Sequence, residues 1–334
     1  MHFIHSVIVV FSTLLFANLS LANQIAKPIN NHAWLFAEPL TIDNLNISGI
    51  VKTDDFMALA SDEGNQVEIF KPDSKGIWQK HHLVTLSNNT YEIDLEALAW
   101  QKPYLYALGS HSAKRKKVKS SLSQKENINR LEKIYLEPAR QQLFRIELNS
   151  KAKSVDIQSL SLTEELANHP ILKSFIGIPS KENGIDIEGL AVDSKGRLLL
   201  GFRGPVLRGN IVPVLRLKIE KKRFAIKKLK TLFLTLSGNG VRGLSETKNQ
   251  FLVLTGANGD QTTPYQVCLW NGEPELAGKD SNPSNLDLLC DLPGLKGKPE
   301  GIQFMKQTQG HIDFLIVQDG LKNGLALPFR CLLH

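Results

Sequence analysis

The stretch from Gly184 to Leu207, GIDIEGLAVDSKGRLLLGFRGPVL, constrains the fold more than any other part of the chain. It contains two short apolar segments, Ile187–Val192 and Arg197–Phe202, with Asp193–Gly196 between them. Asp, Ser and Gly are typical of tight turns, and Gly accepts the positive φ that many such turns require. The stretch therefore predicts a β-hairpin.

The beginning of this hairpin recurs four more times in a degraded form. A second apolar run follows each unit and ends in small or polar residues. Successive units are 48, 92, 54 and 58 residues apart. Self-similarity at roughly 40 to 60 residues, with four strands per unit, is typical of a β-propeller. Aligned on a shared Gly or Ala, the units read ISGIV (47–51), LEALA (95–99), IEGLA (187–191), VRGLS (241–245) and PEGIQ (299–303).

The long second interval contains a charged segment, about residues 113–140, that we interpret as an insertion. Within it, residues 120–140 carry a partial apolar stripe and predict a helix that Pro138 ends. Without the insertion, this interval is close to the others. We therefore predict an all-β, five-bladed propeller with one helical insertion in blade two. Six blades are the alternative, if residues 141–162 and their surroundings form a blade that lacks the repeated unit.

The blades of a propeller share one continuous core, so we expect residues 23–334 to form a single domain. In propellers, a strand from one terminus often completes the blade at the other terminus. The C-terminal tail, residues 321–334, is weakly patterned, whereas Trp34–Ala37 is apolar and strand-like. Trp34–Ala37 could therefore supply the closing strand.

Residues 1–22 resemble a secretory signal peptide. Val7–Leu15 is an almost unbroken apolar run, and Ser20-Leu21-Ala22 offers small residues at positions −3 and −1 of a cleavage site. A membrane anchor is the alternative, but the apolar run is shorter than the roughly 20 residues that a spanning helix needs. We expect a periplasmic or secreted monomer with no transmembrane span after signal removal.

Three cysteines occur in a chain that we expect to meet an oxidising compartment. Cys268 and Cys290 lie in strand-like segments that could be neighbours in one blade. We weigh a Cys268–Cys290 disulfide equally against two separate buried thiols, with Cys331 left over near the C-terminus. The cysteine spacing does not indicate a zinc or haem site.

The chain has 40 Lys and Arg against 33 Asp and Glu, a net charge of +7. Much of this excess is local, in Lys114–Lys119 and Lys221–Lys230. One interpretation is an anionic partner, and the other, which we favour, is solvated charge on a loop and on an outer edge strand. Aromatic residues are not interleaved with these lysines, so we do not expect a nucleic-acid partner.

The hairpin geometry brings polar residues to one face of the propeller. We call the residue before the shared Gly or Ala the marker position. Because the second strand runs antiparallel to the first, a residue some fifteen positions later returns to the same face. This predicts five pairs at the mouth of the central channel: Ser48 with Asp62, Glu96 with His111, Glu188 with Arg203, Arg242 with Asn258, and Glu300 with Asp319.

The segments IEGLAVDSKGRLLLGFRGPVLRG, ASDEGNQVEIF, YALGSHSAKRK, VRGLSE and PEGIQF together resemble a family of bacterial secreted propellers of unknown function. The resemblance covers about residues 47–320 and implies a propeller fold and export, but no established activity. A weaker resemblance is to phytase-like and esterase-like propellers and to the lactonase and strictosidine-synthase group. In several of those proteins, the Glu of a Glu-Gly motif binds a divalent cation at the channel. Glu188 and Glu300 match that motif, Glu96 is followed by Ala, and Ser48 and Arg242 depart from it.

We interpret the channel mouth first as a binding site for an unknown small molecule or envelope component, contacted by Arg203, Arg242 and Asn258. The alternative is metal-assisted hydrolysis of an ester, lactone or phosphoester. His111 would be the general base and the arginines would hold an anionic group. A Ca-like divalent cation would be held by Asp62, Glu96, Glu188, Glu300 and Asp319.

A third interpretation is structural. The charges at the marker positions and their partners nearly balance, so pairs such as Glu188 with Arg203 could be salt bridges that tie blades together. A metal site normally has a stronger negative surplus. Whether the protein is an enzyme stays open at this point.

Overall fold

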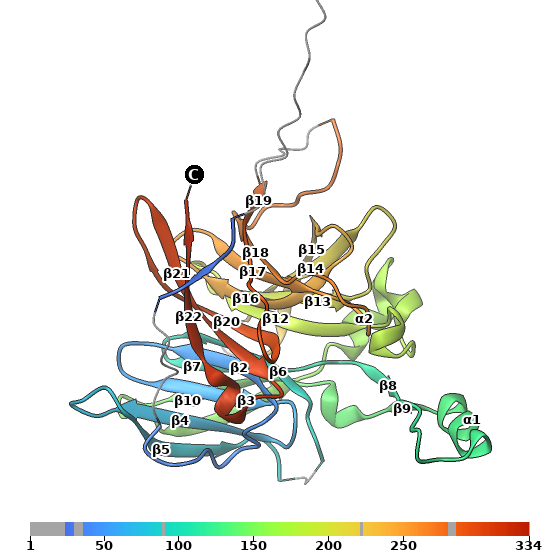
Figure 1. The fold of residues 1–334 in the computed structure, drawn as a ribbon, viewed down its shortest axis with the longest axis horizontal. Coiled ribbons are helices and arrows are strands. Elements are labelled where there is room, and N and C mark those ends of the chain that lie inside the picture. The colour runs from blue at the N-terminus through green and yellow to red at the C-terminus, as the bar shows by residue number, and fades with distance from the viewer. Residues whose placement is uncertain (1–23, 30–35, 89–90, 221–222, 280–284, 334) are drawn as a thin grey trace, which may run out of the picture.

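The computed structural model describes residues 24–29, 36–88, 91–220, 223–279 and 285–333. The expected signal peptide, residues 1–22, lies outside the described residues, as do Trp34 and Leu35. The strands form five antiparallel four-stranded sheets around a common centre (Figure 1). The predicted five-bladed propeller is confirmed, and residues 143–160 provide the two outer strands of blade two rather than a sixth blade.

Each blade takes its strands from the centre outwards in chain order, except at the edge of blade five. Blade one consists of β2 (Ile47–Lys52), β3 (Met57–Ser61), β4 (Gln66–Pro72) and β5 (Trp78–Thr85). Blade two consists of β6 (Leu95–Gln101), β7 (Tyr104–Gly109), β10 (Leu143–Leu148) and β11 (Ser154–Leu160). Blade three consists of β12 (Asp186–Val192), β13 (Arg197–Gly204), β14 (Ile211–Ile219) and β15 (Ile226–Thr235). Blade four consists of β16 (Gly240–Glu246), β17 (Phe251–Gly256), β18 (Gln266–Trp270) and β19 (Leu286–Asp291), and blade five of β20 (Lys298–Gln307), β21 (His311–Asp319), β22 (Leu327–Leu332) and β1 (Lys27–Pro28).

The innermost strands β2, β6, β12, β16 and β20 contact one another in a closed ring. The Gly after the marker position permits this close approach. A Cβ at Gly189 would lie 2.8 Å from side-chain atoms of Leu244 and Val241 in blade four. A Cβ at Gly301 would lie 2.7 Å from the carbonyl oxygen of Ser48 in blade one. Glycine at 189 and 301 is therefore a packing requirement, because real Cβ atoms do not approach so closely.

The N-terminal strand β1 closes blade five by pairing with β22, with Lys27 opposite Arg330. The predicted closing strand, Trp34–Ala37, is therefore wrong. Phe36 forms an isolated bridge with Trp78 instead, and the Ala37 N–H donates to the Trp78 carbonyl at the outer edge of blade one. Lys27–Pro28 carries little of the apolar pattern on which that prediction rested.

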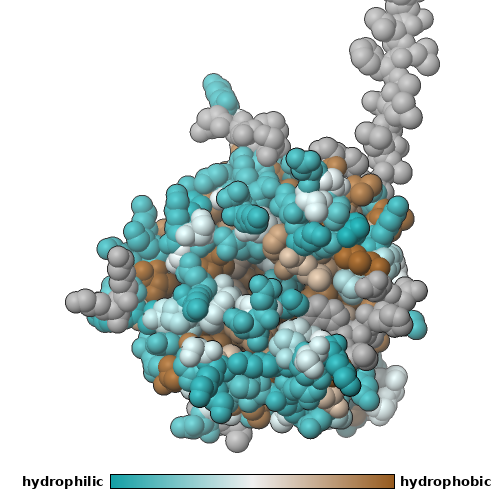
Figure 2. Space-filling model, turned by 90° about the vertical axis from the view of Figure 1, so that its left-hand side faces the viewer, coloured by the Kyte–Doolittle hydropathy of each residue, from teal (hydrophilic) through white to brown (hydrophobic). Residues whose placement is uncertain are grey.

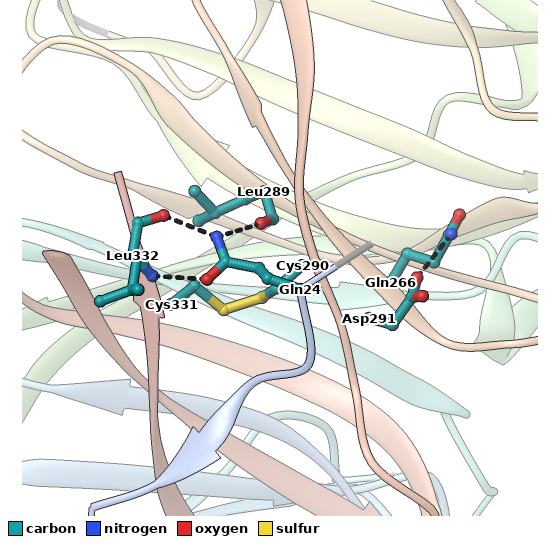
Figure 3. Close-up of a disulfide and its surroundings, with 7 residues drawn as sticks. All are labelled: Gln24, Gln266, Leu289, Cys290, Asp291, Cys331 and Leu332. Atoms are coloured by element: carbon teal, nitrogen blue, oxygen red, sulfur yellow. Dashed lines mark hydrogen bonds between the residues drawn. A yellow bond between two sulfur atoms is a disulfide. The ribbon is translucent and has the colours of Figure 1, made fainter. Parts of the chain in front are cut away.

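A disulfide between Cys290 of β19 and Cys331 of β22 joins blades four and five (Figure 3). The side chain of Gln24 donates to the Leu289 and Leu332 carbonyls beside it, so the N-terminal segment spans the same seam. The alternative of a Cys268–Cys290 disulfide is wrong. Cys290 pairs with Val267, one position before Cys268, so the two thiols lie on opposite faces of the sheet. Cys268 is buried and free, and burial raises the pKa of its thiol to about 12.

The insertion in blade two contains a two-stranded ribbon, β8 (Ala113–Arg115) with β9 (Ile134–Leu136), and the helix α1 (Gln124–Glu132). The predicted helix over residues 120–140 is therefore too long. Ser123 caps α1 in a capping box with Glu126, and the helix ends before β9. Elsewhere the described chain has only one other α-helix, α2 (Thr163–Asn168). None of the described helices has the length and apolar character to cross a membrane.

Candidate functional site at the channel mouth

Every marker position is the extra residue of a β-bulge. In the five inner strands, the pairing skips one residue, from Ile47 to Gly49, Leu95 to Ala97, Ile187 to Gly189, Val241 to Gly243, and Pro299 to Gly301. A bulge leaves its extra residue out of the ladder and can re-aim its side chain. This repeated bulge explains how five strands of one ring all direct a polar side chain into the channel.

The five marker side chains line one pocket of about 560 Å³ at the channel mouth. Asp62, Arg203 and Asp319, from the ends of the second strands, line it as well. The predicted convergence of marker residues and their partners is thus observed for eight of the ten residues. The other two, His111 and Asn258, do not line this pocket.

His111 lies behind the channel wall, and its predicted role as a general base has no place in this geometry. Its side chain is buried, with Nδ1 2.8 Å from the Gly109 carbonyl and Nε2 accepting the Leu162 N–H. Burial lowers the pKa of the imidazole to about 4, so the ring is neutral at pH 7. His111 departs from the predicted pairing because the backbone there turns to φ 57° at the root of the insertion.

Asn258 lies in a loop at the rim. Its amide donates to Asn183 at 3.0 Å and its carbonyl accepts from Gln261. Asn258 therefore organises the loop, and it is Gln261 that reaches the pocket.

Two arginines form a buried network with the marker carboxylates. Arg203 lies 2.8 Å from Glu188 Oε1 and 3.5 Å from Asp186. Arg242 lies 2.9 Å from Glu188 Oε2 and also forms an ion pair with Glu300. Glu188 and Arg242 are 3% and 4% exposed as side chains, so these pairs are shielded from water. This part of the ring matches the predicted salt-bridge interpretation, and it ties blade three to blades four and five.

Carboxylate oxygens of Glu96, Asp186 and Glu188 lie within 4.8 Å of one another. Among the residues that the structure describes, none donates a hydrogen bond to Glu96 or pairs with its charge. Burial, and then repulsion from Glu188, raise the pKa of Glu96 well above its usual range. The same two causes raise the pKa of Asp186, which is 3% exposed, to about 8.

Asp62 and Asp94 extend this acidic side of the pocket. Burial and repulsion from Asp94 raise the pKa of Asp62 to about 8, and Asp62 Oδ1 is buried without a partner in the described part of the chain. Asp94 is better satisfied, because it accepts a hydrogen bond from Ser110 and pairs with Arg140. Asp319 is paired too, with Lys298 at 3.1 Å. The predicted cage of five carboxylates is thus divided, and Glu300 and Asp319 have cationic partners.

Asp94 and Asp186 were missed by the sequence reasoning, although a signal existed. Each lies two residues before a marker position, and so do Asn46 and Lys298, which also line the pocket. These residues occupy the same place in successive repeats, so this second ring was accessible from the pattern. Lys114, Lys117 and Arg140 reach the mouth from the insertion, where no repeat places them.

One protein family matches most of the chain. A family profile described as "Protein of unknown function (DUF3616)" matches residues 46–324. The chain belongs to this family. A comparison with curated proteins finds no match.

Among solved structures, the chain is similar to a crystal structure of a protein from Bacteroides uniformis, described provisionally as a 6-phosphogluconolactonase. The two chains are 9% identical with a TM-score of 0.37 over 68% of this chain. This chain spans about half (51%) of that protein's length. A likeness this distant carries no argument about activity.

Proposed function

We propose that the channel mouth binds a small ligand that brings positive charge to Glu96 and Asp186, and that a divalent cation of the calcium type is the simplest such ligand. The observation that carries this proposal is the cluster of three carboxylates within 4.8 Å, one of which, Glu96, has no countercharge among the described residues. Such a cluster is costly when buried, and bound positive charge offsets the repulsion.

The donor set fits a hard cation. Calcium prefers oxygen ligands, six to eight of them, and all three side chains here offer carboxylate oxygens. Glu188 is already shared by two arginines, so Glu96 and Asp186 are the groups with binding capacity to spare. Asp186 adds to this capacity, because it is 3% exposed and its contact with Arg203 is long, at 3.5 Å.

Thermal unfolding of the chain from Asn23 onward tests the proposal, first with EDTA and then with millimolar Ca²⁺. A ligand at about one hundred times its Kd adds roughly 2.7 kcal/mol, which shifts Tm by on the order of 5 °C. We expect this shift in the wild type and in Asp260→Asn, a control at the pocket rim, and its loss in Glu96→Gln. An absence of any shift in the wild type contradicts the proposal.

A second candidate function, cation-assisted hydrolysis of an ester, lactone or phosphoester, is supported by the titration of Asp62. Its pKa of about 8 suits proton transfer near neutral pH, and it lines the same pocket as the carboxylate cluster. Lys117 and Lys181 at the mouth offer positive charge for an anionic substrate group. Turnover that requires Ca²⁺ and falls at least a hundredfold in Asp62→Asn would support it. Binding of Ca²⁺ without turnover of an ester, lactone or phosphoester would contradict hydrolysis and leave cation binding as the function.

We also propose that the protein is exported. Support comes from the Cys290–Cys331 disulfide across two blades, a bond that persists in oxidising compartments, together with the signal-like sequence of residues 1–22. N-terminal sequencing of the protein from the periplasm or medium should begin at Asn23. Recovery from the cytoplasm with an intact residue 1–22 segment would contradict export.

A further inference from the structure

The insertion of blade two is built as a rigid arm that buries almost nothing at its tip. We define the arm as residues Ala113–Leu136. Helix α1 has no buried residue, and Figure 1 places it at the far right, beyond the strands of the blades. Folded chain that covers no core of its own and presents an ordered surface is a candidate for docking.

The arm is held together internally, so its surface is preorganised. Arg130 donates to the Lys117 carbonyl at 2.9 Å, and Asn127 donates to the Lys119 carbonyl at 2.9 Å. Its root is fixed to the propeller by Arg115, whose guanidinium pairs with Glu182 at 2.5 Å. The exposure of the arm is therefore a property of its fold.

Aliphatic side chains are exposed along the arm. They share faces where the geometry is regular: Ile128 and Leu131 are three residues apart on α1, and Ile134 and Leu136 alternate on one face of the β8–β9 ribbon. The exposed fractions are 50% for Val118, 48% for Ile128, 47% for Leu131, 44% for Ile134 and 59% for Leu136.

The arm is also strongly basic. It contains eight lysines and arginines and two glutamates, a net charge of +6, and the net charge of the whole chain is +7. By contrast, Figure 2 shows the side of the molecule turned away from α1 as mostly hydrophilic, with hydrophobic residues in scattered patches. On the arm, positive charge is interleaved with exposed aliphatic residues.

We propose that the arm docks on an anionic phospholipid bilayer. Basic residues attract the headgroups, and the aliphatic side chains enter the boundary between headgroups and acyl chains. A protein partner is less well matched, because protein interfaces centre on Trp, Tyr and Arg, whereas the apolar residues here are Val, Ile and Leu. The one aromatic residue of the arm, Tyr135, is covered by Lys116, whose Nζ lies 4.8 Å from the ring centre. This proposal does not depend on a ligand at the channel mouth.

Vesicle co-sedimentation tests the proposal. The chain from Asn23 onward is used, because it holds all described residues and omits the apolar Val7–Leu15 run, which could bind lipid by itself. Phosphatidylcholine vesicles with and without about one third phosphatidylglycerol are compared at low salt. The test variant carries Lys119→Gln, Lys125→Gln and Lys133→Gln, all exposed on the arm. The matched control carries Lys227→Gln, Lys228→Gln and Lys230→Gln, which remove the same charge from the exposed edge of β15.

We expect wild type and control to bind the anionic vesicles, and the arm variant to bind on the order of a hundredfold more weakly, given about fivefold per basic residue. A second variant, Ile128→Ser with Leu131→Ser, should lose at least tenfold at unchanged Tm. Equal loss in the arm variant and the control, full binding by the serine variant, or no binding by the wild type would each overturn the proposal. If the wild type instead forms a dimer that the serine variant abolishes, a second copy of this chain is the occupant.

Discussion

Replacing Asp186 by Asn should make the protein more stable at alkaline pH and leave it nearly unchanged in acid. Asp186 faces Glu188 and Glu96 on the acidic side of the pocket, with Asp94 also near, and Arg203 and Arg242 as the nearby cations. Burial and repulsion outweigh the arginines, so the pKa in the folded protein is about 8 against a usual value of 3.8.

The sign follows from linkage. A group whose pKa is raised in the folded state stabilises the fold, and this contribution to the free energy of unfolding is complete below the unfolded pKa. The contribution is lost as pH rises through the folded pKa. The wild type should therefore lose stability relative to Asp186→Asn between pH 4 and about 8. The full difference in pKa corresponds to roughly 6 kcal/mol. The Asn amide is a neutral polar group like the protonated carboxyl, so its own cost is the same at every pH, and we expect a difference of about 5 kcal/mol at pH 8.

Urea unfolding of both proteins in EDTA, at intervals from pH 4 to pH 9, measures the difference in free energy of unfolding. A difference that does not change with pH, or one that favours the wild type in alkali, would refute the reasoning about Asp186. Calcium should reverse the order at pH 8, because a bound cation stabilises the charged carboxylate that only the wild type has.

Three further perturbations test other parts of the structure by urea unfolding. Replacing Cys290 and Cys331 by Ser should cost about 4 kcal/mol for a sequence separation of 41 residues, and an unchanged midpoint would show that the disulfide does not form. Gly189→Ala should cost about 1–3 kcal/mol by forcing two blades apart, whereas Gly294→Ala, which has open space around it, should be tolerated; equal effects would contradict the packing argument. Arg242→Met leaves Glu300 without its arginine and Glu188 with Arg203 alone, and should cost about 3–5 kcal/mol; an unchanged midpoint would contradict this.

The repeat made the fold predictable. The hairpin pattern and its spacing depend on local chemistry that each blade repeats, so blade number and the ring of marker residues could be inferred without a structure. The bulge was not visible in the sequence, but its consequence was. A polar residue stood at the same place in each unit, where strand alternation alone demands none.

Other features depend on the meeting of distant segments. Cys290 could be assigned to a strand, but its partner depends on which face of blade four it occupies and on which blade lies opposite. The two-residue strand Lys27–Pro28 has no pattern of its own and is defined by its partner, β22. His111 follows the repeat in position, yet the insertion root turns its side chain into the core. Repetition predicts a residue's place only while the backbone keeps to the repeat.

The central claim, that Glu96 and Asp186 bind a divalent cation at the channel mouth, is tested most directly by titration calorimetry with Ca²⁺ at pH 7 in two buffers of different ionisation enthalpy. Burial and repulsion raise the pKa of both carboxyls, that of Asp186 to about 8, so Asp186 is largely protonated at pH 7 before binding. We expect one bound ion and the release of at least about one proton per ion, so the measured heat should differ between the buffers. Absence of binding at millimolar Ca²⁺, or binding with the same heat in both buffers, would contradict it.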